Sequence, residues 1–155
     1  MKLVFTTAFL LCAVASAANA ETFTFKSTSQ NLNSINVATG ATTFVGAGFS
    51  ENESQGVYAS GQKTNTKGTC AGWSAPVGSQ FTNEGACTYT EGASDKASIV
   101  FSCVSDAKTG ASDCWGALRG ISGRHMGKTG TISWHQTNSA DGKTGAAAGT
   151  GMWND

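Results

Sequence analysis

Residues 97–119 read ASIVFSCVSDAKTGASDCWGALR, and this stretch has the pattern of a complete β-hairpin. Apolar or small residues recur at every second position on both sides of a central loop, which predicts strands over 97–104 and 113–119. The loop Asp106-Ala107-Lys108-Thr109-Gly110 has the Asp-x-x-x-Gly form of a short hairpin connection, whose glycine is free to take a positive φ. Folding the chain about Lys108 and Thr109 brings Cys103 opposite Cys114. The stretch therefore predicts two antiparallel strands joined by a disulfide.

A second turn of the same form occurs near the C-terminus, where Asp141-Gly142-Lys143-Thr144-Gly145 again ends in Lys-Thr-Gly. Folding the chain about Asp141 and Gly142 places Trp134 near Gly149 and Ile132 near Gly151. A large ring over a glycine is a familiar way to cover exposed backbone in a strand. The C-terminal residues are therefore expected to form another antiparallel hairpin.

The same reading extends to the rest of the chain, which contains one proline and 20 glycines and has no long helical pattern. Short strands are predicted near residues 22–26, 42–49, 56–61, 67–73, 85–91, 97–104, 113–119, 130–137 and 146–153. Residues 30–40 are expected to form a loop or a short helix at one end of the fold. Eight or nine short strands with hairpin spacing indicate an all-β fold, either a single antiparallel β-barrel or a sandwich.

The first twenty residues, MKLVFTTAFLLCAVASAANA, have the pattern of a secretory signal peptide. One positive charge at Lys2 precedes an apolar run, and Ala18-Asn19-Ala20 is a small-x-small cleavage site. Cleavage after Ala20 would remove Cys12 and leave residues 21–155 as a single domain with no transmembrane segment. The expected location is secreted or periplasmic.

Four cysteines remain in the mature chain, and an even number in an exported protein indicates two disulfides. Three connectivities exist. We favour Cys70 with Cys87 and Cys103 with Cys114, because both pairings are local and both enclose turn residues. A zinc site is the alternative, but zinc-binding cysteines normally come in Cys-x2-4-Cys pairs, which this sequence lacks. We therefore predict no metal and no cofactor.

Charge argues against nucleic acid as a partner. Without Lys2 the chain has nine Lys and Arg against ten Asp and Glu, a net charge of −1, and the cations are scattered among turns. The stretch Gly123-Arg124-His125-Met126-Gly127-Lys128-Thr129-Gly130 looks like a phosphate-binding loop. However, it has only three residues between its first two glycines, and the strand-like 131–135 follows where a phosphate-binding loop needs a helix. A hairpin turn is the favoured interpretation.

Candidate catalytic residues are few. His125 and His135 are the only histidines, and without a third ligand or a recognisable partner each is better explained as a surface or hydrogen-bonded residue. Ser133 shares a strand face with His135, and Ser122 lacks the Gly-x-Ser-x-Gly elbow of many hydrolases. No catalytic residue is predicted.

Two carboxylates, Glu51 and Glu53, would share one face if residues 50–54 were extended, and paired carboxylates serve glycoside hydrolysis. The surrounding sequence, SENESQG, is polar throughout and ends in glycine, so a solvated loop is expected. Asn52-Glu53-Ser54 is also a glycosylation sequon, relevant only in a eukaryotic secretory pathway.

The tryptophans are the main candidates for a binding site. Trp73, Trp115, Trp134 and Trp153 all stand in or beside predicted strands, and His135 follows Trp134. If they point inward they form the core. If some line the mouth of a barrel, they form an apolar pocket for a small ligand together with His135.

The C-terminal third resembles a known type of barrel. Trp115-Gly116-Ala117-Leu118-Arg119-Gly120-Ile121-Ser122-Gly123-Arg124, then Gly127 and Thr129-Gly130, and then Gly149-Thr150-Gly151-Met152-Trp153 are similar to the glycine-punctuated strands of dirigent and allene oxide cyclase type proteins. This resemblance implies an eight-stranded antiparallel barrel, often oligomeric, with a hydrophobic interior that holds or orients an apolar ligand. No catalytic residue of those proteins can be matched to a position here.

Three functions are consistent with these patterns. The first is a small exported barrel that binds an apolar or amphiphilic small molecule. The second is an isomerase or cyclase that uses the barrel interior to orient its substrate. The third is a non-catalytic envelope or interaction protein, which could form a homo-oligomer. One barrel fold supports many functions, so the residues and geometry of the site are needed to distinguish among the three.

Overall fold

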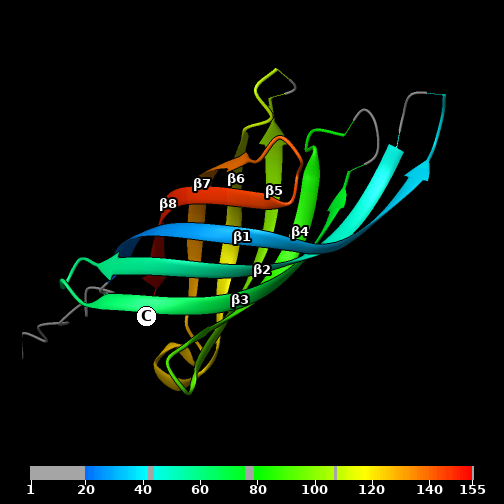
Figure 1. Cartoon of the computed structure of the whole chain (residues 1–155). Coiled ribbons are helices and arrows are strands. Elements are labelled where there is room, and N and C mark those ends of the chain that lie inside the picture. The colour runs from blue at the N-terminus through cyan, green and yellow to red at the C-terminus, as the bar shows by residue number, and fades with distance from the viewer. Residues whose placement is uncertain (1–19, 42–43, 76–78, 107, 155) are drawn as a thin grey trace, which may run out of the picture.

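The chain forms a closed barrel of eight antiparallel strands in sequence order, in which the last strand pairs with the first (Figure 1). The computed structural model describes residues 20–41, 44–75, 79–106 and 108–154. The strands are β1 (Glu21–Ala38), β2 (Phe44–Tyr58), β3 (Lys63–Ser74), β4 (Asn83–Glu91), β5 (Asp95–Ser105), β6 (Ser112–Ser122), β7 (Thr129–Asn138) and β8 (Thr144–Asn154). A 3-10 turn, η1 (Gly123–His125), lies between β6 and β7. The structure therefore confirms the predicted barrel and rules out the alternative of a sandwich.

Both predicted hairpin registers are confirmed. In the β5–β6 pair Cys103 lies opposite Cys114, and in the β7–β8 pair Trp134 lies opposite Gly149. The loop glycines Gly110 and Gly142 adopt φ values of 70° and 67°, which residues with a Cβ rarely adopt. In the first loop the positive φ lies at the glycine of the Asp-x-x-x-Gly pattern, whereas in the second it lies at Gly142, because Gly145 already belongs to β8.

Both preferred disulfides are formed, each between directly opposed residues of neighbouring strands. Cys70 and Cys87 join β3 to β4 with a Cα–Cα distance of 4.0 Å, and Cys103 and Cys114 join β5 to β6 with one of 4.1 Å. All four side chains point into the barrel. Two disulfides in a small domain are typical of proteins that fold in an oxidising, extracytoplasmic compartment.

The N-terminal half of the barrel differs from the prediction. Residues 30–38 continue β1 as a strand, and residues 50–55 belong to β2, so the expected loops are absent at both places. In 50–55 the side chains alternate between water outside the barrel and a polar interior, whereas residues 31–38 are exposed on both faces. Since neither segment has a face buried in the apolar core, the sequence shows no clear apolar period of two there. Merging the two runs at 42–49 and 56–61 reduces nine predicted strands to eight; residues 42–43 lie outside the described part of the chain.

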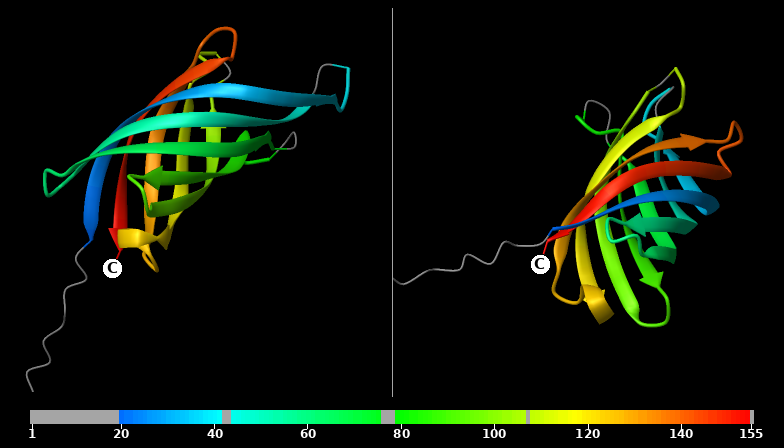
Figure 2. Two further views of the ribbon diagram at one scale, coloured as in Figure 1. Left: turned by 60° about the horizontal axis from the view of Figure 1, so that its bottom comes forward. Right: turned by 90° about the vertical axis from the view of Figure 1, so that its left-hand side faces the viewer.

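The two longest strands extend beyond the barrel wall. Pairing of β1 with β8 ends at Gln30–Thr144, and pairing of β2 with β3 ends at Ala47–Trp73, whereas β1 and β2 stay paired as far as Ala38–Phe44. Figure 2 shows the resulting hairpin standing clear of the other strands. Leu32 is an extra residue in β1 at a register shift between Asn31 and Asn33, where the hairpin leaves the barrel.

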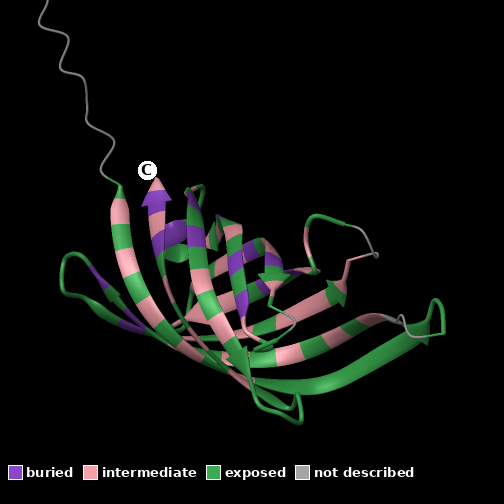
Figure 3. Ribbon diagram, turned by 90° about the horizontal axis from the view of Figure 1, so that it is seen from above, coloured by how far each residue is buried: buried purple, intermediate pink, exposed green. Residues whose placement is uncertain are grey.

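The buried core lies towards one end of the barrel, near the C-terminus (Figure 3). Its most buried side chains are Tyr58, Cys87, Ile99, Leu118, Ile132 and Trp153. Residues 1–19, which contain nearly all of the predicted signal peptide, lie outside the described part of the chain. The described residues contain no helix long and apolar enough to cross a membrane.

Candidate ligand-binding cavity

The barrel encloses a cavity of about 890 Å³, to which all eight strands contribute side chains. Cavities of about 300–1,000 Å³ are typical of sites for small organic ligands. Eight strands give a barrel just wide enough to be filled by its own side chains or to hold one small ligand. The question is therefore why this barrel is hollow.

The barrel is hollow because glycines lie opposite large aromatic rings and let those rings pack against the wall. A Cβ added at Gly68 would overlap the ring of Tyr89, and one added at Gly151 would overlap the ring of Phe23. A Cβ at Gly85 would lie 2.5 Å from Cζ of Phe101. Each ring therefore packs against the backbone of the neighbouring strand. The aromatic side chains line the wall, and the middle of the barrel stays open.

The end of the cavity near the C-terminus is apolar. Phe101 and Trp134 meet edge to face with their ring centres 5.4 Å apart, and Phe23 and Tyr58 lie at the same separation. The apolar lining comprises Phe23, Phe25, Tyr58, Tyr89, Ile99, Phe101, Leu118, Ile132, Trp134 and Trp153. Such a surface favours the apolar part of a ligand because burial removes that part from water.

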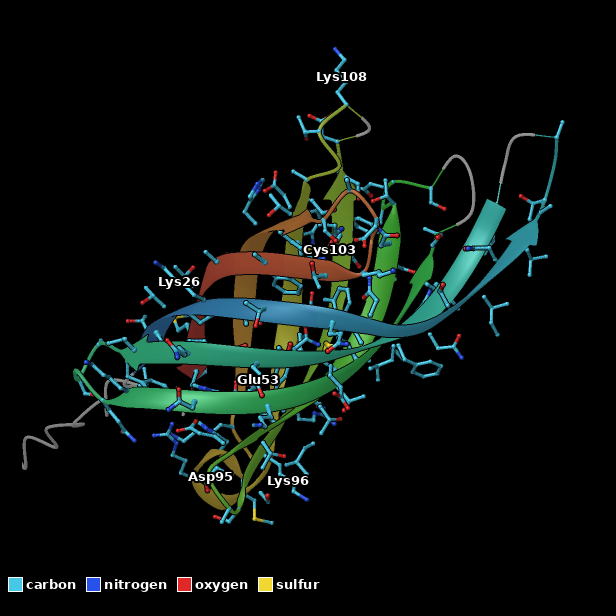
Figure 4. The ribbon with its side chains drawn as sticks, viewed as in Figure 1. Lys26, Glu53, Asp95, Lys96, Cys103 and Lys108 are labelled. Atoms are coloured by element: carbon cyan, nitrogen blue, oxygen red, sulfur yellow. A yellow bond between two sulfur atoms is a disulfide. The ribbon has the colours of Figure 1, made fainter. Side chains whose placement is uncertain are left out.

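The opposite end of the cavity is polar, and its lining of Ser27, Ser29, Asn31, Ser50, Asn52, Ser54, Gln136 and Asn138 is uncharged. Thr66, which also lines the cavity, lies opposite Glu91 in the β3–β4 pair. The charged side chains of the lining include Glu91 and Asp95 at the floor and Glu84, Asp141 and Lys143 at the mouth. Figure 4 shows the two ends of the barrel, with Lys108 on a loop at the open end and Asp95 at the other.

The closed end has a compact polar cluster under the apolar lining. The guanidinium of Arg124 donates a hydrogen bond to Glu91 Oε1, lies 3.6 Å from Asp95 Oδ2 through Nε, and covers the ring of Tyr58 at 4.6 Å. The His125 ring is buried, stacks on Trp153 with ring centres 4.5 Å apart, and places Nε2 3.4 Å from Glu91 Oε2. These contacts tie η1 to β2, β4, β5 and β8 and close the floor of the cavity.

Two tyrosines in the cavity stay neutral over a wide pH range. Burial raises the pKa of Tyr89 to about 12, and burial together with the nearby Glu91 carboxylate raises the pKa of Tyr58 to about 12. The Tyr89 hydroxyl lies 3.7 Å from Cys70 Sγ. Both phenols are therefore uncharged hydroxyl groups at physiological pH.

The structure separates the predicted site residues into an inner and an outer group. Trp134 and Trp153 line the cavity, and Trp73 borders its mouth with 45% of its surface exposed. Trp115 lies on the outer wall against Phe81, at 5.6 Å between ring centres. His135 is also outside, where its Nδ1 lies 2.8 Å from Asp113 Oδ1. The parity of the strands explains this, since Trp115 follows the inward Cys114 and His135 follows the inward Trp134.

The paired carboxylates also lie on the outer wall. Glu51 and Glu53 share the outer face of β2, and Glu53 pairs with Lys67 at 2.8 Å. Asn52 points inward, where its amide lies 3.1 Å from Cys70 Sγ, so the folded barrel covers the predicted sequon.

Sequence reasoning missed both the floor cluster and the polar lining. The alternation of side chains along a strand indicates both. Glu91 lies on the same strand face as Cys87, and Ser27 and Ser29 lie on the same face as Phe25. Extending the inward face of each strand past its apolar residues would have found these side chains. Arg124 and His125 could not be found in this way, because η1 lies outside the alternating pattern.

No protein-family model matches the chain, and no curated protein matches it either. Among the described residues, no group of three or more His, Cys, Asp and Glu side chains is arranged to hold a metal ion. The chemistry of the cavity is therefore the most direct guide to function.

Proposed function

We propose that this protein is an exported β-barrel that binds an apolar or amphiphilic small molecule in its interior. The single observation that carries the proposal is the cavity of about 890 Å³, apolar and aromatic at one end and polar at the other. The resemblance to dirigent and allene oxide cyclase type barrels points the same way. The disulfides and the signal-peptide pattern support a secreted or periplasmic location.

Binding is a better description than turnover because the reactive groups of the floor are engaged with one another. Arg124 is held by Glu91 and Asp95, and His125 is stacked on Trp153 beside the same Glu91. Each contact uses a group that general acid–base catalysis would need to direct at a substrate. The cluster thus supports a role in closing the cavity.

The test is saturable binding of Nile red, a neutral fluorescent dye, to the mature protein comprising residues 21–155. Ser54→Phe would fill part of the cavity, and we expect it to weaken Nile red binding by about tenfold or more. Gln55→Phe adds the same ring to the exposed face of the same strand and is expected to leave the affinity unchanged. Absence of saturable binding by the folded wild-type protein, or equal effects of both variants, would contradict the proposal.

A second candidate, self-association, is favoured by the free edge of the long hairpin. Beyond Asn31, whose N–H donates to Lys143 O, β1 has β2 as its only strand partner among the described residues, so one row of its backbone N–H and C=O groups is open to another strand. Ile35 and Val37 are 65% and 58% exposed on this segment. Natural edge strands are usually protected by charge or proline, and residues 27–50 contain neither.

The partner we infer for this edge is a second copy of the chain. Antiparallel pairing about Ile35 places the segment against itself, and the absence of charge means that no like charges meet across the two-fold axis. We expect a concentration-dependent dimer in native mass spectrometry and light scattering, which Ile35→Lys converts to monomer. A wild-type protein that stays monomeric at every concentration would rule the dimer out.

A further inference from the structure

The polar end of the cavity has a definite chemistry that narrows the class of ligand. Residues 27–50 contain no charged side chain and supply Ser27, Ser29, Asn31 and Ser50 to the polar lining. Asn52 and Ser54 follow them in β2. The groups offered are hydroxyls and carboxamides. Such groups both donate and accept hydrogen bonds, which suits a partner that does the same.

Several of these groups are unpaired and exposed to the cavity. The hydroxyls of Ser29, Ser54 and Thr66 line it, and none of them hydrogen-bonds another described residue. Asn52 uses only its amide nitrogen, which donates to Ser50 Oγ at 3.3 Å and to Cys70 Sγ, and its carbonyl oxygen stays free. A molecule in the cavity therefore meets donors and acceptors that the fold itself does not use.

A carboxylate head would find no free cation in this region. Arg124 lies at the floor and is already paired with Glu91. Lys143 lies at the mouth, largely exposed and 3.9 Å from Asp141. Of the carboxylates that an ammonium head could meet in the lining, Glu91 and Asp95 are paired with Arg124 and Asp141 lies beside Lys143. Moving a charged group from water into a site with no free partner charge is costly, whereas a neutral hydroxyl exchanges its water for the protein's hydrogen bonds.

We infer that the ligand is an amphiphile with a neutral, polyhydroxylated head, of the alkyl glycoside or acylglycerol type. Its apolar chain lies among the rings near the floor, and its hydroxyl groups contact Ser29, Asn52 and Ser54 at the polar end. This inference rests on the proposed function, because it assigns a ligand class to the same cavity.

The direct test compares compounds that share a ten-carbon chain. Decyl glucoside, decanoate and decyltrimethylammonium are titrated below their micelle concentrations into the mature protein by calorimetry and by Nile red displacement. We expect decyl glucoside to bind about tenfold or more tightly than either ion. If decanoate or the ammonium compound binds as tightly as the glucoside, the inference about the head is overturned while the proposed function stands. If Nile red and all three compounds fail to bind, the proposed function itself has failed.

A charge placed in the polar end should reverse the preference. Ser29→Lys puts one cation inside the cavity, and Thr28→Lys puts one on the exposed face of the adjacent position. We expect Ser29→Lys to raise the affinity for decanoate by about tenfold relative to decyl glucoside, and Thr28→Lys to change neither. Equal behaviour of the two variants would count against the inference. Circular dichroism and thermal unfolding check the fold, and Ser54→Lys with Gln55→Lys provides a second matched pair if Ser29→Lys does not fold.

Discussion

The two tyrosines offer a sharp test of the hollow, closed barrel, because they are the only tyrosines in the chain and both line the cavity. Their pKa values are raised to about 12, mainly by burial. An unfolded tyrosine has a pKa of about 10, so at pH 11 it is about nine-tenths ionised, whereas a group with a pKa near 12 is about one-tenth ionised. The folded protein should therefore show almost no tyrosinate absorbance near pH 11, and unfolding in urea at that pH should release the signal of two phenolates.

The same shift makes stability depend on pH with a definite sign. A phenol whose pKa is raised in the folded state contributes no pH dependence below about pH 10, and stability is lost as the pH rises from about 10 to about 12, because only the unfolded state releases the proton there. For Tyr89 the loss at pH 11 is about 1.4 kcal/mol. Tyr58 adds a loss of the same sign, since its pKa is also raised to about 12 even with Arg124 beside it favouring the phenolate.

Urea unfolding at pH 9, 10 and 11 measures this effect, with Tyr89→Phe as the matched variant. The substitution should remove about half of the loss that the two tyrosines cause between pH 9 and pH 11, and it should halve the tyrosinate signal released on unfolding. A wild-type protein whose tyrosines titrate in the folded state at about pH 10 would refute the reasoning. It would mean that water reaches both phenols freely and that the barrel is not closed at its floor.

Three further outcomes are expected. Replacing Cys103 and Cys114 together by alanine should lower the free energy of unfolding by about 3 kcal/mol, from the 11-residue separation that the disulfide closes, as urea denaturation can measure. Arg124→Ala should remove the hydrogen bond and ion pairs that hold η1, destabilise the fold by about 2 kcal/mol and lower hydrogen-exchange protection at the closed end first. Trp134→Ala should weaken Nile red binding, whereas Trp115→Ala on the outer wall should leave it unchanged.

The parts of the fold that could be predicted are those where a local pattern has one physical solution. An aspartate and a glycine four residues apart define a short loop, and the loop then fixes which residues face each other. That is why the pairs Cys103–Cys114 and Trp134–Gly149 follow from the sequence alone. Each pair also determines which neighbouring side chains point into the barrel and which point outward, since side chains alternate along a strand.

The parts that could not be predicted are those where no strand face is buried in the apolar core. Residues 30–38 and 50–55 are strands because both belong to the β1–β2 ladder, in which 30–38 pair with 44–51 and 50–55 pair with 26–31, and a long-range partner leaves no mark in the local composition. The same holds for the polar lining, which serine and asparagine form as readily as they form loops. Residues 31–38 are exposed on both faces, so backbone pairing alone makes this segment a strand.

The division of the interior into an apolar end and a polar end explains how one short chain can form both a stable barrel and an open cavity. Stability comes from the apolar end, where rings pack on glycines and where two disulfides cross-link four strands. The polar end contributes little burial, and serine and glycine in place of larger side chains leave its volume unfilled. A sequence selected only for stability would fill an eight-stranded barrel with branched apolar side chains. Keeping part of the interior small, polar and uncharged forgoes that stabilisation and leaves the cavity open.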